Sequence, residues 1–215
     1  MAMEVVRAIL AKCGLVGRMT KQIVRRLITS ATIWVCWTLA VTAIPDGRAI
    51  DRDHSSLRVH VYKAGFLSAF AHDHEVEAPI ESGEVTETGS SFVELRVDAR
   101  KIRVLDPEVS DGTRAQIQTT MQGPQVLDAD RYSEIHFRST GIEPKGADHW
   151  VVNGTLDLHG QTHPVTVEVT RKDGLYKGSA TLKQTTFGIT PVAIAGGTVR
   201  VKDDIKIEFE IALAR

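Results

Sequence analysis

The sequence predicts an all-β protein in which about eight antiparallel strands close into a barrel, with one short helix near the barrel mouth. Three observations predict this fold: apolar residues recur at every second position in many short runs, turn residues separate these runs closely, and a single segment has a helical pattern. Closure is expected because it removes the exposed edges of the sheet. The interior of such a barrel is either filled by its own side chains or holds one small ligand. The alternation of apolar and polar residues is the same in both cases and does not distinguish them.

Alternation is the main evidence for the strands. In the run 57–62, Leu57, Val59 and Val61 are separated by polar or aromatic residues, and the run 205–213 alternates apolar with charged residues almost without fault. Side chains on one face of each strand are therefore expected to point inward and the others outward. The clearest of the alternating runs lie at residues 57–62, 92–98, 152–158, 165–169, 176–182 and 205–213.

Turn residues divide these runs. Asp173-Gly174 and His159-Gly160 are two-residue pairs typical of β-hairpins, and Gly196-Gly197 and Asp203-Asp204 are expected to flank the last pair of strands. Asn153-Gly154 also resembles a hairpin tip. We place this glycine inside a strand instead, where a bulge or tight bend is expected.

One segment departs from the β pattern, at residues 111–122. Ser110 or Asp111 is a suitable N-terminal cap, and Gly123-Pro124 ends the segment. Ile117 and Met121 are four residues apart and share one helical face. This face is enough for a helix lying across the barrel mouth, and equally for a surface helix packed on the sheet.

The first 43 residues have the composition of a secretory signal peptide. Six of the 26 basic residues but only one of the 27 acidic residues occur there, and an apolar run, residues 27–44, follows Arg25-Arg26. Small residues in Val41-Thr42-Ala43 match a peptidase site. Cleavage is therefore predicted after Ala43, which would leave residues 44–215 as a single periplasmic or secreted domain.

Two alternatives concern this first segment. Translation that begins at Met19 would give a signal peptide of better proportions, and export is expected from either start. An uncleaved segment would instead tether the domain to a membrane, which would then be the protein's only membrane contact, because its apolar run is near the lower limit for spanning a bilayer.

Composition excludes several classes of function. The formal net charge is −1, so no clustered basic surface for nucleic acid is expected. Both cysteines, Cys13 and Cys36, lie in the predicted signal peptide, which leaves the mature chain without thiol nucleophiles, Cys-ligated zinc or disulfides. No catalytic elbow, phosphate loop or dinucleotide motif occurs, and no cofactor is predicted.

The long last strand could pair with a second copy of the chain and form a homodimer if the barrel is open at that edge.

Four stretches together resemble the YceI-like family, and the resemblance extends over nearly all of the mature chain. Its most specific part is Gly154-Thr-Leu-Asp-Leu-His-Gly-Gln-Thr162. The resemblance implies an exported, lipocalin-like barrel whose apolar cavity holds a polyisoprenoid or similar lipid, and a binding protein rather than an enzyme. The other three stretches are Asp53-His-Ser-Ser-Leu-Arg-Val-His-Val61, Val126-Leu-Asp-Ala-Asp-Arg-Tyr-Ser-Glu-Ile-His-Phe-Arg-Ser139 and Thr186-Phe-Gly-Ile189.

An apolar tunnel can hold a lipid chain without many polar contacts, since each ligand CH₂ removed from water contributes roughly 0.8 kcal/mol. The polar head would stay at the mouth. The alternative for each wall residue is ordinary core packing. The predicted wall consists of Leu57, Val59, Val61, Val93, Leu95, Val97, Phe137, Leu156, Leu158, Val167, Leu182 and Phe209, with Phe66, Phe70, Met121 and Phe187 near the openings.

Histidine residues support a different hypothesis, a metal- or haem-handling accessory protein. His72 and His74 would lie on one side of an extended segment, and such a pair can chelate zinc or copper. A third ligand would have to come from His54, His60, His136 or His163. The plainer alternative is that the pair makes structural hydrogen bonds at a strand start. A hydrolase with an unrecognised Ser-His-Asp site is the second alternative.

Overall fold

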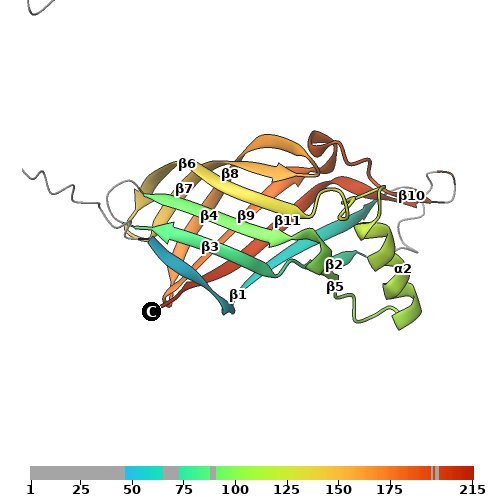
Figure 1. Ribbon diagram of the computed structural model, residues 1–215, viewed down its shortest axis with the longest axis horizontal. Coiled ribbons are helices and arrows are strands. Elements are labelled where there is room, and N and C mark those ends of the chain that lie inside the picture. The colour runs from blue at the N-terminus through green and yellow to red at the C-terminus, as the bar shows by residue number, and fades with distance from the viewer. Residues whose placement is uncertain (1–46, 65–72, 88–90, 195, 197–198) are drawn as a thin grey trace, which may run out of the picture. The chain divides into compact units, whose positions relative to one another are not determined.

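Residues 47–64, 73–87, 91–194, 196 and 199–215 are described by a computed structural model of the protein (Figure 1). The predicted signal peptide lies outside these residues. The described strands belong to one compact unit, Ile44–Arg215. Within the described residues, no helix has the length and apolar character needed to cross a membrane.

Strands dominate the described chain. They are β1 (Gly47–Ala64), β2 (His74–Glu77), β3 (Ile80–Thr86), β4 (Phe92–Asp98), β5 (Arg103–Val104), β6 (Glu134–Gly146), β7 (His149–Leu158), β8 (Gln161–Lys172), β9 (Leu175–Lys183), β10 (Ala193–Ile194) and β11 (Val199–Leu213). The helical elements are the 3₁₀ turns η2 (Ala99–Lys101) and η3 (Gln184–Phe187) and the α-helix α2 (Asp111–Gln122).

The eight long strands form a closed ring. Among the described residues they pair in the order β1, β3, β4, β6, β7, β8, β9 and β11, and β11 then pairs back onto β1. All these pairings are antiparallel. The strands cross the barrel obliquely, as Figure 1 shows. The predicted all-β, lipocalin-like barrel with eight strands is therefore confirmed.

Strand β11 is paired on both sides in the closed ring. Its residues pair with β9 on one side and with β1 on the other. Because both sides are occupied, the condition under which this strand was expected to form a homodimer is not met.

The two predicted hairpins are present. His159 (φ 51°) and Gly160 (φ 70°) connect β7 to β8, and Asp173 (φ 55°) and Gly174 (φ 79°) connect β8 to β9. Two successive residues with positive φ are the geometry of a type I′ turn, whose twist matches that of the strands. Gly154 lies inside β7 as predicted, opposite Ser139, where the register of β6 shifts at a bulge.

The prediction of a turn at Asp203-Asp204 is wrong. These residues lie inside β11, which continues across them with a local shift of register against β1. The acidic side chains have other partners: the Asp203 carboxylate accepts hydrogen bonds from the Thr185 backbone N–H and hydroxyl at 2.8 and 2.7 Å, and Asp204 pairs with Lys183 at 3.0 Å. Carboxylates with such partners do not interrupt a strand.

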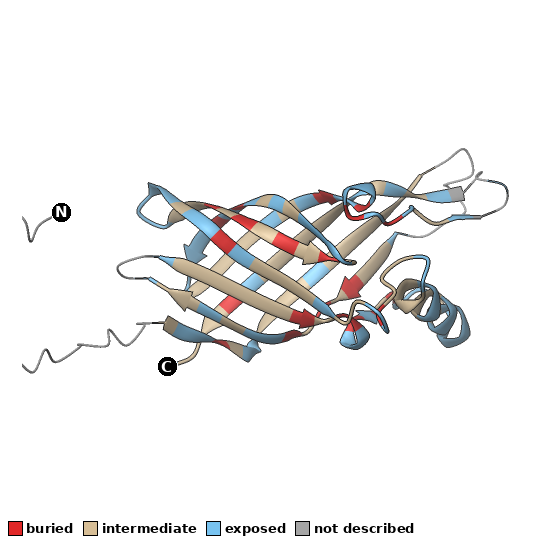
Figure 2. Cartoon of the chain, turned by 45° about the horizontal axis from the view of Figure 1, so that its top comes forward, coloured by how far each residue is buried: buried red, intermediate tan, exposed pale blue. Residues whose placement is uncertain are grey.

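Helix α2 begins and ends where the sequence predicted. The Ser110 hydroxyl accepts a hydrogen bond from the Thr113 N–H at 3.2 Å and caps the helix. The Gln118 side chain joins the helix to the chain around β5, because its amide accepts from the Val104 N–H at 2.8 Å and donates to the Ile102 carbonyl at 2.7 Å. Most of α2 remains exposed (Figure 2).

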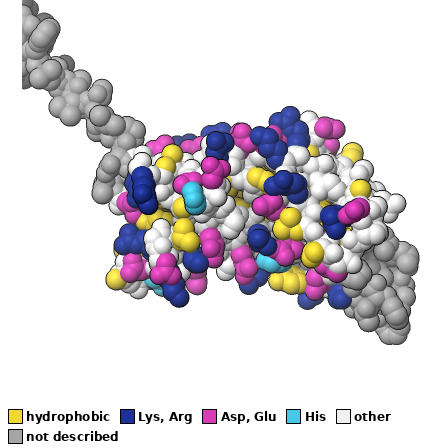
Figure 3. Space-filling model, turned by 90° about the horizontal axis from the view of Figure 1, so that it is seen from below, with side chains coloured by type: hydrophobic (Ala, Val, Ile, Leu, Met, Phe, Trp, Pro, Cys, Tyr) yellow, Lys and Arg dark blue, Asp and Glu magenta, His cyan; other side chains and the backbone are white. Residues whose placement is uncertain are grey.

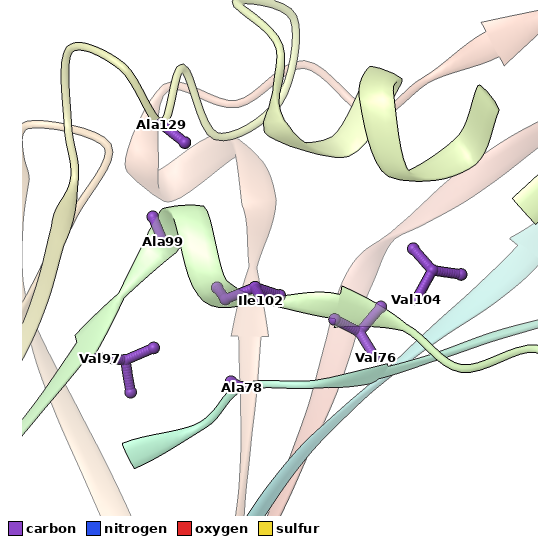
Figure 4. Close-up of a cluster of buried hydrophobic side chains, with 7 residues drawn as sticks. All are labelled: Val76, Ala78, Val97, Ala99, Ile102, Val104 and Ala129. Carbon is purple, nitrogen blue, oxygen red and sulfur yellow. The ribbon is translucent and has the colours of Figure 1, made fainter. Parts of the chain in front are cut away.

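A cluster of small apolar side chains lies at this end of the barrel (Figure 4). Ile117 and Met121 of α2 pack against it, so the helix is a covering element at one barrel end. The buried members of the cluster are Val76, Ala78, Val97, Ala99, Ile102, Val104 and Ala129.

The outside of the barrel is charged and carries both signs. Figure 3 shows Lys and Arg side chains interspersed with Asp and Glu over the face it displays. Lys177 pairs with Glu210 at 2.7 Å across β9 and β11, and Arg103 pairs with Glu77 at 2.8 Å across β5 and β2. The polar positions of the alternating strands are thus the outer face.

Candidate functional site: an apolar cavity within the barrel

The barrel is hollow. A cavity of about 510 Å³ extends along its interior, and almost all of its lining side chains are aliphatic or aromatic. The inward-facing residues Leu57, Val59, Leu95 and Phe209 are only half-buried, although they point away from bulk solvent. Their remaining exposure is therefore to the cavity, and the many half-buried strand positions in Figure 2 agree with an unfilled interior.

Most residues of the predicted wall lie on this cavity. The residues found there are Leu57, Val59, Val61, Val93, Leu95, Val97, Met121, Phe137, Leu156, Leu158, Val167, Leu182 and Phe209. Phe66 and Phe70 fall outside the described residues. The structure thus places the predicted residues around one space, and their contact with a ligand stays a prediction.

Phe187 is not part of the wall, contrary to its predicted place near an opening. Its side chain is 1% exposed and packs in a cluster behind Leu156 and Leu158, which themselves line the cavity. Its ring meets the His163 ring edge-on, with 5.3 Å between centroids. The η3 turn directs the ring into this cluster, and a turn at this position is not visible in an alternation pattern.

The wall also contains residues that the sequence analysis did not select. Val165, Val169, Ile205 and Ile207 belong to alternating runs, and consistent use of the same period would have found them. Ile102, Val126, Leu127 and Ile189 lie outside strands, so only the fold brings them to the cavity. All eight line it in the structure.

Two glycines shape the wall. An added Cβ at Gly154 would lie 2.5 Å from the Phe137 ring and 2.6 Å from the Arg138 carbonyl, and one at Gly178 would lie 2.5 Å from the Phe209 ring. Each ring thus lies directly over a glycine of a neighbouring strand, an arrangement that covers backbone left bare by the missing side chain.

Polar side chains of the lining concentrate at the end of the cavity away from α2. There the strands β3, β8 and β9 start or end, and the lining includes Thr86, Glu87, Ser91, Arg171 and Tyr176. We call this set the polar end. Gln184, at the opposite end, has a 2.8 Å hydrogen bond from its side-chain amide to the Lys202 carbonyl.

Contacts within the polar end are ionic and aromatic. The Tyr176 hydroxyl donates to the Glu87 carboxylate, and Arg171 lies 3.6 Å from the same carboxylate. Burial, followed by the hydrogen bond to Glu87, raises the pKa of Tyr176 above its usual value, so this hydroxyl keeps its proton. The Trp150 ring lies beside Tyr176, with 5.9 Å between centroids, and beneath the Arg171 guanidinium. This end can therefore form hydrogen bonds with a polar group.

The predicted metal pair is represented in the structure by His74 alone, because His72 lies outside the described residues. The His74 ring nitrogen Nδ1 is 2.6 Å from the carboxylate of Asp106, which is 1% exposed and also accepts from the Glu75 N–H at 2.8 Å. This contact is the structural hydrogen bond at a strand start that was the alternative to chelation. Within the described part of the chain, no three His, Cys, Asp or Glu residues are grouped to hold a metal ion.

The other histidines proposed as third ligands each contact a different partner. His54 contacts Asp51 at 2.9 Å, His60 contacts Glu208 at 3.1 Å, and His136 contacts Glu94 at 2.9 Å. His163 packs on Phe187. Among the described residues, the hydrogen-bond partners of histidine rings are carboxylates and one carbonyl, with no serine or threonine hydroxyl.

Fold and site together define a class: closed antiparallel barrels built around an apolar cavity. Within that class, the family profile described as the YceI-like domain matches residues 49–213 of the chain. The protein therefore belongs to the YceI-like family, as the sequence resemblance indicated.

Similar proteins agree with this assignment. A UPF0312 protein of Vibrio parahaemolyticus is 35% identical over 79 residues, which are 36% of this chain and 42% of that protein. A UPF0312 protein of Shewanella oneidensis is 32% identical over 79 residues, 36% of this chain and 41% of the relative. The matches thus span less than half of the length of these relatives.

Two solved structures share the fold. The crystal structure of BcnA from Burkholderia cenocepacia aligns with a TM-score of 0.59 at 19% identity, over 77% of this chain and 99% of the other. A polyisoprenoid binding domain from Saccharophagus degradans, implicated in plant cell wall breakdown, aligns with a TM-score of 0.51 at 14% identity, over 77% and 96%. At these identities the likeness establishes the fold.

Proposed function

We propose that this protein is an exported binding protein that holds one lipid or polyisoprenoid chain in its barrel and keeps it from water, and that it acts by sequestration rather than catalysis. The observation that carries this proposal is the 510 Å³ cavity with its nearly continuous apolar wall. The polyisoprenoid binding domain of Saccharophagus degradans, which shares the fold, supports the same ligand class.

The energetics favour an apolar occupant. An apolar cavity of about 150 Å³ stays dry and accepts benzene, because water there lacks hydrogen-bond partners. The space in this barrel is about three times larger. Each CH₂ of a ligand that enters contributes roughly 0.8 kcal/mol, so a chain of several isoprene units gains enough to be retained during purification.

The test is native mass spectrometry of protein purified without detergent from an exporting host, followed by lipid and metal analysis of the same sample. One apolar adduct per chain is expected. The mass of the polypeptide also tests export, because removal of residues 1–43 would leave Ile44 as the first residue.

A matched pair of variants tests the cavity itself. Ala180 lines it from β9, whereas its neighbour Ser179 is exposed on the outer face of the same strand. Ala180→Trp fills the space without adding a charge and is expected to lower the bound lipid at least tenfold; Ser179→Trp should leave it unchanged. Equal lipid in both variants, with both folded by circular dichroism, would refute binding in the cavity. An empty wild-type protein, or one that holds only zinc or copper, would also refute the proposal.

A further inference from the structure

Glu87 connects strands that are not neighbours in the barrel. It follows β3 directly, and in the ring β3 is separated from β9 by β1 and β11. Its carboxylate nevertheless accepts a hydrogen bond from Tyr176 of β9, lies 3.6 Å from Arg171 of β8, and lies 3.4 Å from Arg48 of β1. One carboxylate thus reaches side chains of three other strands at the polar end of the cavity.

The two guanidinium groups around Glu87 already have other oxygen partners. Arg48 donates to the Ala214 carbonyl at 2.9 Å, and Arg171 donates to the Asp148 carboxylate at 3.1 Å. Two cations and two carboxylates are therefore present in this network, and their formal charges cancel. Without Glu87, the same network would carry one net positive charge.

This balance of charges affects which head group of a lipid chain can bind at the polar end. A carboxylate or phosphate at the end of a chain would approach the Glu87 carboxylate, and would compete with Glu87 and Asp148 for the charge of Arg171. This approach is unfavourable because the negatively charged head group and the Glu87 carboxylate repel each other. A hydroxyl or carbonyl end can exchange hydrogen bonds with Tyr176, Thr86 or Ser91 while leaving the ion pairs in place.

We propose that Glu87 makes the polar end selective for chains that end in an uncharged hydrogen-bonding group, and that it excludes chains ending in a carboxylate or phosphate. This inference rests on the proposed binding of a lipid chain in the cavity. It assigns to Glu87 the role of a specificity-determining residue, and it places the polar head of the ligand beside Tyr176, away from α2.

The test compares two probes with the same tail, dodecanol and dodecanoate, by isothermal titration calorimetry. The sample is lipid-free protein purified in its exported form, and the pH is one at which dodecanoate is ionised. Glu87→Gln removes the charge, keeps the shape of the side chain, and leaves one oxygen that can accept the hydrogen bond from Tyr176. Glu143→Gln is the matched control. Glu143 is exposed on β6 at the same barrel end, pairs with Lys145 at 2.8 Å, and does not line the cavity.

In the wild-type protein and in Glu143→Gln, dodecanol is expected to bind about tenfold more tightly than dodecanoate, a modest factor because the charged groups are partly exposed. Glu87→Gln should tighten dodecanoate about tenfold and change dodecanol less than about twofold. An unchanged ratio of the two dissociation constants in Glu87→Gln would overturn the inference. So would an equal change of this ratio in Glu143→Gln, because a charge effect independent of the cavity would then be sufficient.

The proposed function fails in a different way. If neither probe binds the wild-type protein, or if Ala180→Trp leaves dodecanol binding intact, the cavity is not the binding site, and the role of Glu87 fails with it. If Ala180→Trp abolishes dodecanol binding and Glu87→Gln leaves the preference unaltered, only the role of Glu87 is refuted.

Discussion

A hollow barrel predicts that Phe187 and Phe209 contribute very differently to stability. Phe187 is 1% exposed and enclosed on all sides by a cluster that includes Leu158 and Leu182. Phe209 is half-buried, packs on the barrel wall beside Gly178, and faces the cavity with its remaining surface. The perturbation is therefore the same truncation, Phe to Ala, at an enclosed site and at a wall site.

The expected change in the free energy of unfolding follows from the packing contacts that each truncation removes. Phe187→Ala opens a new void where a fully buried ring was packed, which typically lowers the free energy of unfolding by about 3–5 kcal/mol. Phe209→Ala only enlarges an existing space, and the ring has packing partners on one side, so about half of that loss is expected, ~1.5–2.5 kcal/mol.

Urea denaturation of lipid-free protein measures both changes, and similar m values would show that the extent of unfolding is the same. The reasoning is refuted if the two truncations cost the same within about 0.5 kcal/mol, a typical limit for resolving such differences. Such a result would mean that the interior is packed around Phe209 as tightly as around Phe187.

Two further predictions concern polar contacts that position the barrel ends. Asp106→Asn should lower the free energy of unfolding by about 2–3 kcal/mol in urea denaturation, because the buried carboxylate accepts from both His74 and the Glu75 N–H; a loss below about 0.5 kcal/mol would contradict it. The Arg100 guanidinium, which donates to Asp98, lowers the pKa of that carboxyl from 3.8 to about 2. A carboxyl whose pKa is lowered in the folded state stabilises the protein at pH values above its unfolded-state pKa. This stabilisation is lost as the pH falls through the folded-state pKa. Asp98→Asn should thus be less stable than wild type near neutral pH, and the difference in urea midpoint should shrink between about pH 4 and pH 2; a constant difference over that range would exclude this charge effect.

Local features of the fold were predictable because local chemistry controls them. The His159-Gly160 and Asp173-Gly174 turns have the positive φ angles that their residue types tolerate, and the helix begins at its Ser110 cap. The expected turn at Asp203-Asp204 failed for a different reason. Its acidic side chains find partners on Thr185 and Lys183, which are distant in sequence, and such partners are not visible in a turn propensity.

The candidate site was predictable only in part. Alternation identified which side chains of a strand point inward, so residues such as Val59 and Leu95 were found. It did not identify Arg171 and Tyr176 as parts of one polar end with Glu87, because β8 and β9 are far from β3 in the chain.

The sequence by itself determined the alternation of the main strands, the turns at His159-Gly160 and Asp173-Gly174, the helix and the family, since these depend on residue type and on spacing along the chain. Whether the interior is filled or hollow was decided only by the tertiary structure. Alternation gives the direction of a side chain, whereas the space between opposite walls depends on how many strands close the ring and how the rings of Phe137 and Phe209 lie against Gly154 and Gly178. The cavity and the charge balance at its polar end are therefore properties of the closed barrel.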